Sequence, residues 1–124
     1  MTWGQEILRA LLLTLGATEI ITNLCYLTRK NGLELARKQH GELPNNISNK
    51  QIKIKVICML LSGIAFFGSS LLCYILHKYL HNIILMTTIS FSLYGIIEAL
   101  YYRYWKTICF AFVTILLLIC SILI

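Results

Sequence analysis

"TICFAFVTILLLICSILI", residues 107–124, contains no charged side chain and shows no polar stripe at helical spacing. A helix in a water-soluble bundle keeps one polar face toward the solvent. An apolar stretch of about 18 residues or more is instead typical of a helix that crosses a lipid bilayer. Residues 107–124 therefore indicate an integral membrane protein and exclude a water-soluble helix bundle.

Three other stretches have the length and hydrophobicity of membrane spans, namely residues 7–27, 55–76 and 83–102. Hydrophobic residues make up 58% of the 124-residue chain, and charged residues make up 13%. A soluble domain carries roughly twice that charged fraction. The sequence predicts an all-α polytopic membrane protein, a single domain of four transmembrane helices in two hairpins. A basic cytoplasmic segment at about 28–54 separates the first two helices.

The first apolar stretch is expected to remain in the mature protein. A secretory signal peptide begins with a positively charged region and ends at a small-residue cleavage site. Here the chain starts "MTWGQE", and no Lys or Arg precedes Arg9.

The distribution of Lys and Arg predicts the orientation of the spans. Nine of these eleven residues fall on one side of the membrane, and the excess marks the cytoplasmic face. Both termini are therefore expected outside the cytoplasm, in a multi-pass protein of the cell membrane. The nine are Arg29, Lys30, Arg37, Lys38, Lys50, Lys53 and Lys55 before the second span, and Arg103 and Lys106 before the fourth.

Seven of these basic residues, from Arg29 to Lys55, lie in or next to the segment between the first two spans. We expect them to contact anionic lipid headgroups or an acidic partner protein, because juxtamembrane basic clusters bind anionic membranes. Nucleic acid is not expected as a partner, since the cluster flanks membrane spans and does not line a soluble face.

The segment between the first two spans also has local structure signals. "LELARKQHGELP" is compatible with a short amphipathic helix that ends at Gly41 and Pro44. Gly32 is a candidate C-terminal cap of the preceding helix. Ser48 and Gln51 have the spacing of a capping box, which predicts that the next helix begins there.

Glu19 lies near the middle of the first span, where an ionised carboxylate costs roughly 2.5–3.5 kcal/mol. At 100° per residue, Gly16, Thr22, Asn23 and Tyr26 fall on the same side of the helix as Glu19. This face is too polar for lipid. It is expected to turn toward another helix or a water-filled cavity.

The third span repeats the pattern with Tyr94, Gly95 and Glu98 on one side. Gly95 and Glu98 have the same G-x-x-E spacing as Gly16 and Glu19, which hints at a weak internal repeat. Arg103, at the end of this span, is a candidate ion-pair partner for Glu98.

Small residues in the second span predict close helix packing. Ala65 and Ser69 are four residues apart, the spacing that lets two helix backbones approach. The expected packing positions are Gly16, Gly63, Ala65, Gly68, Ser69 and Gly95.

Sequence patterns of catalysis and metal binding are missing. The chain has no Asp, no C-x-x-C, and none of the common hydrolase, zinc or P-loop motifs. His77 and His81 have helical i, i+4 spacing but supply only two ligands, fewer than a zinc site needs. No catalytic residue, metal or cofactor is therefore expected.

Two functions remain open. The first is a non-catalytic subunit or accessory protein, in which a neutral Glu19 hydrogen-bonds within the bundle or to a partner membrane protein. The second is a small oligomeric transporter or channel in which Glu19, alone or with Glu98, binds a proton or cation. The expected contacts are the lipid bilayer and either a partner membrane protein or further copies of the chain.

Overall fold

The computed structural model describes residues 2–41, 43–44 and 46–124, which form five helices and no strand. The helices are α1 (Trp3–Thr28), α2 (Gly32–Gln39), α3 (Asn49–Ile75), α4 (His81–Tyr102) and α5 (Trp105–Leu123). All except α2 are long and apolar enough to cross a membrane. The all-α, four-span prediction is therefore confirmed, and the protein is a multi-pass membrane protein by length and composition of its helices.

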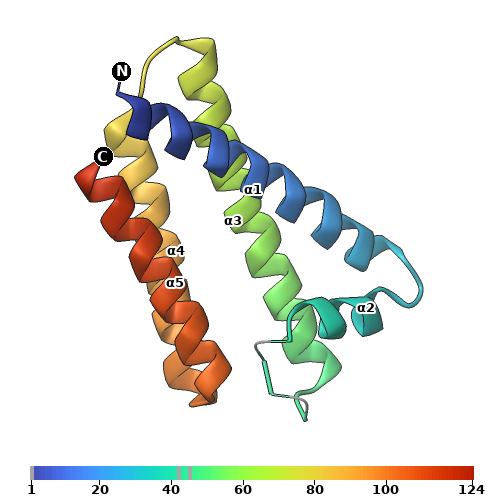
Figure 1. The fold of residues 1–124 in the computed structure, drawn as a ribbon. Helices are drawn as coiled ribbons and strands as arrows, with labels where there is room; N and C mark the ends of the chain where they lie inside the picture. Colours follow the sequence, from blue (N-terminus) through green and yellow to red (C-terminus); the bar gives the residue numbers. More distant parts are fainter. Residues whose placement is uncertain (1, 42, 45) are drawn as a thin grey trace.

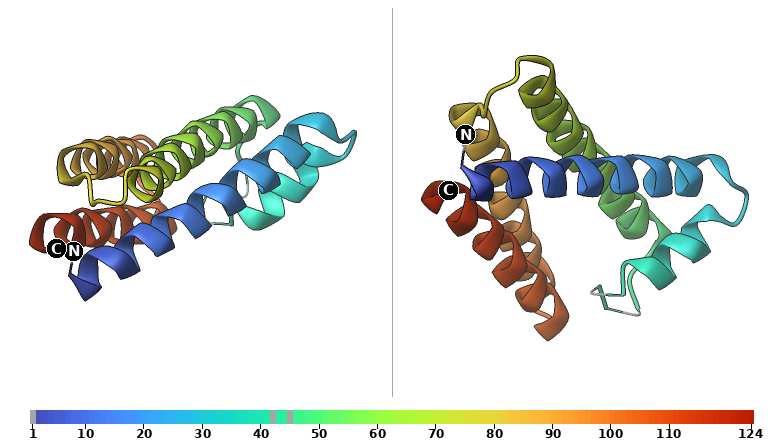
Figure 2. Two further views of the ribbon diagram at one scale, coloured as in Figure 1. Left: turned by 90° about the horizontal axis from the view of Figure 1, so that it is seen from above. Right: turned by 45° about the horizontal axis from the view of Figure 1, so that its top comes forward.

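The four long helices form two antiparallel pairs, α1 with α3 and α4 with α5, which are the two most extensive helix contacts (Figure 1). Both termini and the α3–α4 turn lie at one end of the molecule, and α2 and the α4–α5 link lie at the other (Figures 1 and 2). We call these the terminal end and the α2 end. At the terminal end the Gln5 side chain donates a hydrogen bond to the Ile124 carbonyl (3.2 Å).

Two glycines set the crossing of α1 over α3. A Cβ atom on Gly16 would lie 2.5 Å from the backbone nitrogen of Phe67, and one on Gly63 would lie 2.8 Å from the Cβ of Glu19. Because real Cβ atoms do not approach that closely, only glycine fits both positions. The two backbones therefore pack directly on each other.

The α4–α5 pair has a narrow polar seam that the sequence analysis missed. Thr107, Thr114 and Ser121 recur every seven residues and are all buried. Ser121 shares a hydrogen bond with Thr88 of α4 (2.9 Å). A Cβ on Gly95 would lie 2.7 Å from the Thr114 hydroxyl, so this glycine is the close-contact point of the pair.

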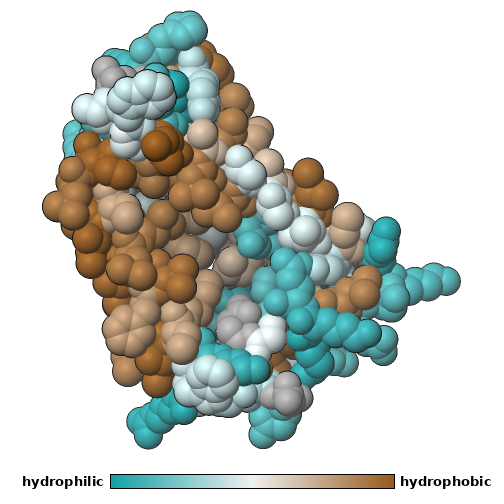
Figure 3. Space-filling model, in the orientation of Figure 1, coloured by the Kyte–Doolittle hydropathy of each residue, from teal (hydrophilic) through white to brown (hydrophobic). Residues whose placement is uncertain are grey.

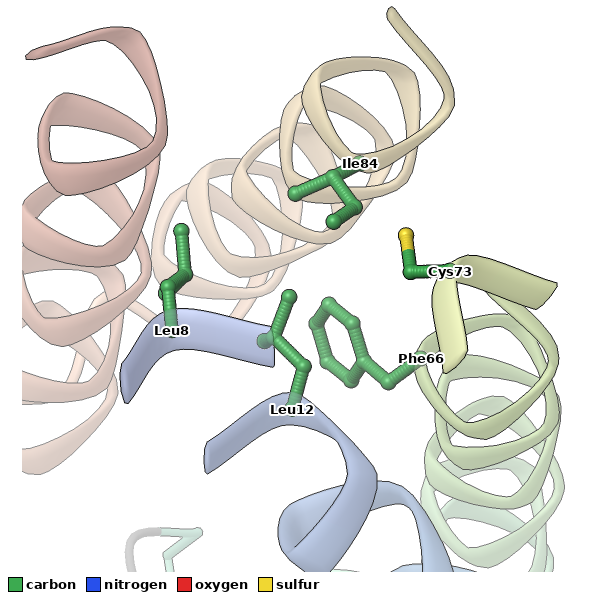
Figure 4. Close-up of a cluster of buried hydrophobic side chains, with 5 residues drawn as sticks. All are labelled: Leu8, Leu12, Phe66, Cys73 and Ile84. Carbon is green, nitrogen blue, oxygen red and sulfur yellow. The ribbon is translucent and has the colours of Figure 1, made fainter. Parts of the chain in front are cut away.

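The two pairs meet mainly at the terminal end. There Leu8 and Leu12 of α1, Phe66 and Cys73 of α3, and Ile84 of α4 form a buried cluster (Figure 4). Toward the α2 end, α3 and α4 diverge (Figure 1). The short α3–α4 turn therefore holds these two helices close together only near the turn.

Ser69 packs between the pairs and hydrogen-bonds Thr87 of α4 (3.0 Å). Ala65 and Gly68, by contrast, are exposed, and a Cβ on Gly68 would meet nothing within 4 Å. These two residues do not contact α1, which approaches α3 on the Gly63 side, and their packing against another helix stays a prediction.

The start of α3 agrees with the sequence. Ser48 and Gln51 form the predicted capping box, so the helix begins at Asn49.

The prediction that Gly32 caps the first helix is wrong. That helix ends at Thr28 with Arg29 as its cap, and Gly32 is the first residue of α2. Glycine is required there for another reason, since a Cβ would overlap the Tyr26 carbonyl.

Hydrophobic and hydrophilic side chains occupy different parts of the surface. Hydrophobic residues cover the long helices, and hydrophilic residues surround α2 and the turn at the opposite end (Figure 3). Many large apolar side chains of the long helices are exposed, as helices that contact lipid require.

Candidate functional site

Lys55 of α3 and Glu98 of α4 form an ion pair between the two helix pairs. The Lys55 ammonium donates to Oε1 (3.0 Å) and Oε2 (2.9 Å) of Glu98. The side chains are 2% and 3% exposed. The bond lies toward the α2 end, where α3 and α4 diverge, and it joins the two helix pairs there (Figure 1).

Aromatic rings complete the surroundings of the Lys55 ammonium. It lies 4.0 Å from the ring centre of Phe110 and 5.2 Å from that of Tyr94. Removing each ion from water costs several kcal/mol. Contact of the ammonium with both carboxylate oxygens and with two ring faces offsets part of that cost.

This ion pair corrects two predictions. Lys55 was expected among the residues that face lipid headgroups, but it is buried and bound to Glu98. Arg103 was expected to pair with Glu98, but it is the exposed C-terminal cap of α4, with φ of 50°. The pattern that locates Lys55 is the buried stripe of Ile52, Val56 and Met59, into which it falls at helical spacing.

A pocket of about 330 Å³ adjoins the ion pair, and we call it the Lys55 pocket. It opens between α3 and α4 near the α2 end, and its walls are almost entirely apolar apart from the ion pair. Its lining residues are Gln51, Ile54, Lys55, Tyr94, Ile97, Glu98, Tyr101 and Tyr102.

A second polar cluster lies on the α1 side. Asn23 donates from Nδ2 to Oε2 of Glu19 (2.8 Å) and to the Glu19 carbonyl (2.7 Å). Its Oδ1 lies 3.2 Å from Nε2 of His40. Asn23 and His40 are buried, and the His40 ring packs edge-on against Tyr26. The cluster therefore ties the residue that follows α2 to the membrane helix α1.

Glu19 itself is half-buried, and no described residue hydrogen-bonds its Oε1 atom. It lines a second pocket of about 560 Å³, here named the Glu19 pocket, together with His40, Met59, Trp105 and Phe110. Thr22, the remaining member of the predicted face, donates to carbonyls of its own helix.

The predicted polar residues thus fall into two clusters. Glu19, Asn23 and Tyr26 lie together on the α1 side, and Tyr94 and Glu98 lie together on the α4 side. The two carboxylates line different pockets. His40 was missed by the sequence analysis because "QHG" reads as the end of a surface helix, and no local pattern ties it to Asn23.

The basic residues of the α1–α3 segment have different surroundings. Arg37 donates to the Ile47 carbonyl (2.8 Å) and to Asn49 (3.0 Å), so it holds the loop before α3. The other five, apart from Lys55, are exposed: Arg29, Lys30, Lys38, Lys50 and Lys53.

The geometry gives no metal centre in the described part of the chain. No group of three His, Cys, Asp or Glu side chains lies close enough to hold a metal ion. His77 lies in the α3–α4 turn with φ of 53°, and His81 starts α4, so the two do not share a helix face.

Comparisons of the chain with protein-family models, curated proteins and solved structures find no match.

Proposed function

We propose that this chain is a non-catalytic subunit or accessory protein of a membrane complex. The observation that carries the proposal is the Lys55–Glu98 ion pair, which uses two intramembrane charges to join the helices of the chain itself. Each of the two ions satisfies the other, and their bond holds α3 of one pair to α4 of the other, which supports a structural use of both charges.

The outer face of α3 supports a partner helix as the neighbour. Gly68 is exposed there with open space around it, and its missing side chain allows the backbone of another helix to approach closely. Ala65 is also exposed, beside the groove that α3 forms with α4. The exposed basic residues at the α2 end provide a second surface, for anionic headgroups or an acidic protein segment. We place this end in the cytoplasm of a cell-membrane protein, since it holds both basic links.

The test is chemical crosslinking of the tagged full chain in its native membrane, followed by purification and mass determination. A constant hetero-partner supports the proposal, and a chain that is always alone or only homo-oligomeric overturns it. Gly68→Leu should abolish the hetero-crosslink and Gly68→Ala should keep it. A Cβ atom on Gly68 would meet nothing within 4 Å, so Gly68→Ala should leave the fold unchanged. The helix content of both variants is measured by circular dichroism, and only a Gly68→Leu protein that keeps its helix content counts in the test.

A small oligomeric transporter or channel is the second candidate. It is favoured by one observation, that Glu19 lies on the wall of the Glu19 pocket with Oε1 unbonded among the described residues. A defined homo-oligomer that moves protons or cations, and loses this flux with Glu19→Gln, would establish it in place of the first.

A further inference from the structure

We propose that the Lys55 pocket binds one acyl chain of an anionic phospholipid from the leaflet at the α2 end, with the headgroup held by Lys50, Lys53 and Arg103. The inference goes beyond the proposed function and does not depend on it. It concerns the ligand that occupies the Lys55 pocket, which opens on the lipid-facing side of the chain.

The walls of the pocket fit an acyl chain. Ile54 and Ile97 face it from α3 and α4, and the rings of Tyr94, Tyr101 and Tyr102 supply the remaining apolar area. Its volume of about 330 Å³ is at the lower end of the range of ligand sites, roughly 300–1,000 Å³. One segment of a lipid chain fills such a space, whereas a partner helix is far too wide.

The location of the pocket also points to lipid. Both walls belong to membrane-spanning helices, and the pocket lies where these helices diverge (Figure 1). In a bilayer the side of such a pocket opens to hydrocarbon. A chain seated there also keeps water away from the Lys55–Glu98 pair, which strengthens their attraction.

Charge around the mouth selects the headgroup. Lys50 and Lys53 belong to the first turns of α3, which also carry Gln51 and Ile54, and Arg103 follows Tyr102 at the end of α4. The three basic residues therefore lie at the same end of the two helices as the pocket, although none of them lines it. All three basic side chains are exposed, and no described acid pairs with them. Exposed basic charge at this end of the pocket attracts an anionic headgroup through flexible side chains, so an anionic phospholipid should be preferred over a zwitterionic one.

The experiment uses the purified full chain in nanodiscs made of phosphatidylcholine and phosphatidylglycerol. One of the two lipids carries a photoreactive diazirine in its acyl chain, and crosslinked residues are mapped by mass spectrometry. We expect labels concentrated on Ile54, Ile97 and Tyr101, and stronger labelling by the phosphatidylglycerol probe. Unlabelled phosphatidylglycerol should compete. Labels spread evenly over all lipid-facing helices would overturn the proposal.

A pair of variants tests the pocket itself. Ile97→Trp should fill the pocket and lower labelling of Ile54 at least fivefold. Leu100→Trp is the matched control, since Leu100 is 69% exposed and Ile97 64%, and only Ile97 lines the pocket. Equal labelling of Ile54 in both variants contradicts the site.

A second pair tests the headgroup. Changing Lys50, Lys53 and Arg103 together to Gln should remove the preference for phosphatidylglycerol over phosphatidylcholine, a loss on the order of fivefold for each charge near the surface. The same change at Arg29, Lys30 and Lys38 keeps the net charge matched and should leave the preference intact. If both triple variants lose it equally, general surface charge explains the binding and the specific site is wrong.

Discussion

Polar side chains on the long helices form hydrogen bonds and an ion pair with one another. Lys55 and Glu98 neutralise each other across the two helix pairs, while Asn23 holds Glu19 and His40 together on the opposite side. A buried pair costs desolvation energy, so its main effect is geometric. It permits one relative position of α3 and α4 and penalises others.

Removing one member of the ion pair should harm the protein more than removing both. Lys55→Met and Glu98→Leu each leave one buried charge without its partner, a loss of about 3–5 kcal/mol in the free energy of unfolding. The double variant replaces the pair by apolar side chains and should recover most of that stability. Thermal unfolding in detergent, monitored by circular dichroism, measures all three. A double variant as unstable as the sum of the single ones contradicts this account.

Substitutions of Glu19 separate a structural role from ion binding. Gln keeps an oxygen that accepts from Asn23, so Glu19→Gln should retain assembly and function. Leu removes the acceptor, and intramembrane hydrogen bonds average about 0.6 kcal/mol, so Glu19→Leu should weaken assembly moderately. Crosslinking yield and function are measured on both. A Glu19→Gln protein that assembles normally but has lost all function would instead favour the transporter.

At the scale of elements, the helices are joined by contacts of different kinds. Glycines set the α1–α3 crossing, a hydroxyl seam runs along α4–α5, and α2 is attached to α1 through His40. A substitution at one of these contacts should therefore weaken that contact without disturbing the others, so each can be tested separately.

Glycine positions on α3 should respond oppositely to a single methyl group. Gly63→Ala places a Cβ against α1, and overpacking of this kind costs about 1–3 kcal/mol. Gly68→Ala enters open space and should be neutral or stabilising by up to about 1 kcal/mol, because Ala favours helix. Unfolding temperatures of the two variants give the comparison. Equal losses would mean that the α1–α3 crossing lies elsewhere.

Loss of the His40 side chain should release α2 without unfolding the spans. His40→Ala removes a hydrogen bond to Asn23, which is worth about 1 kcal/mol or a fivefold change in opening. Amide hydrogen exchange in residues 32–39 should therefore become about fivefold faster. The control is Lys38→Ala, since Lys38 is exposed on the same helix. If both variants exchange alike, α2 does not depend on His40.

Local sequence signals predict the elements well, and long-range pairing escapes them. The four spans and the start of α3 follow from hydropathy and from Ser48 and Gln51, which act over a few residues. Lys55 and Glu98 are 43 residues apart, and no rule of spacing joins them. The prediction that Gly32 caps the first helix is wrong for a related reason. The surroundings of Gly32 depend on how α2 packs against Tyr26 of α1, which local sequence does not show.

The whole molecule consists of two helix pairs that touch at the terminal end and diverge at the α2 end (Figure 2). Gly16 packs on Gly63 in one pair and Gly95 packs on Thr114 in the other, so the two G-x-x-E glycines occupy comparable places. The glutamates differ, since Glu19 bonds within its own helix and Glu98 reaches the other pair. The sequence shows the spacing but does not reveal this difference.

Orientation in the membrane is a prediction for the intact molecule. Cysteine-free protein with a single new cysteine at Asn46 or at Thr2 should react with an impermeant thiol reagent on intact cells only at position 2. We expect this because an excess of Lys and Arg marks the cytoplasmic side of a membrane protein, and nine of the eleven lie toward the α2 end. Reaction at position 46 from outside would reverse the assignment.

The ion pair also has a consequence for the order of synthesis. Ribosomes add about 5–20 residues per second, so Lys55 is made several seconds before Glu98, which lies 43 residues later. Until α4 is added, a pair formed by α1 and α3 holds Lys55 without its carboxylate partner. A nascent or truncated chain that lacks α4 is therefore marked by this lone charge, and membrane quality control has a chemical difference by which to tell an unfinished copy from a complete one.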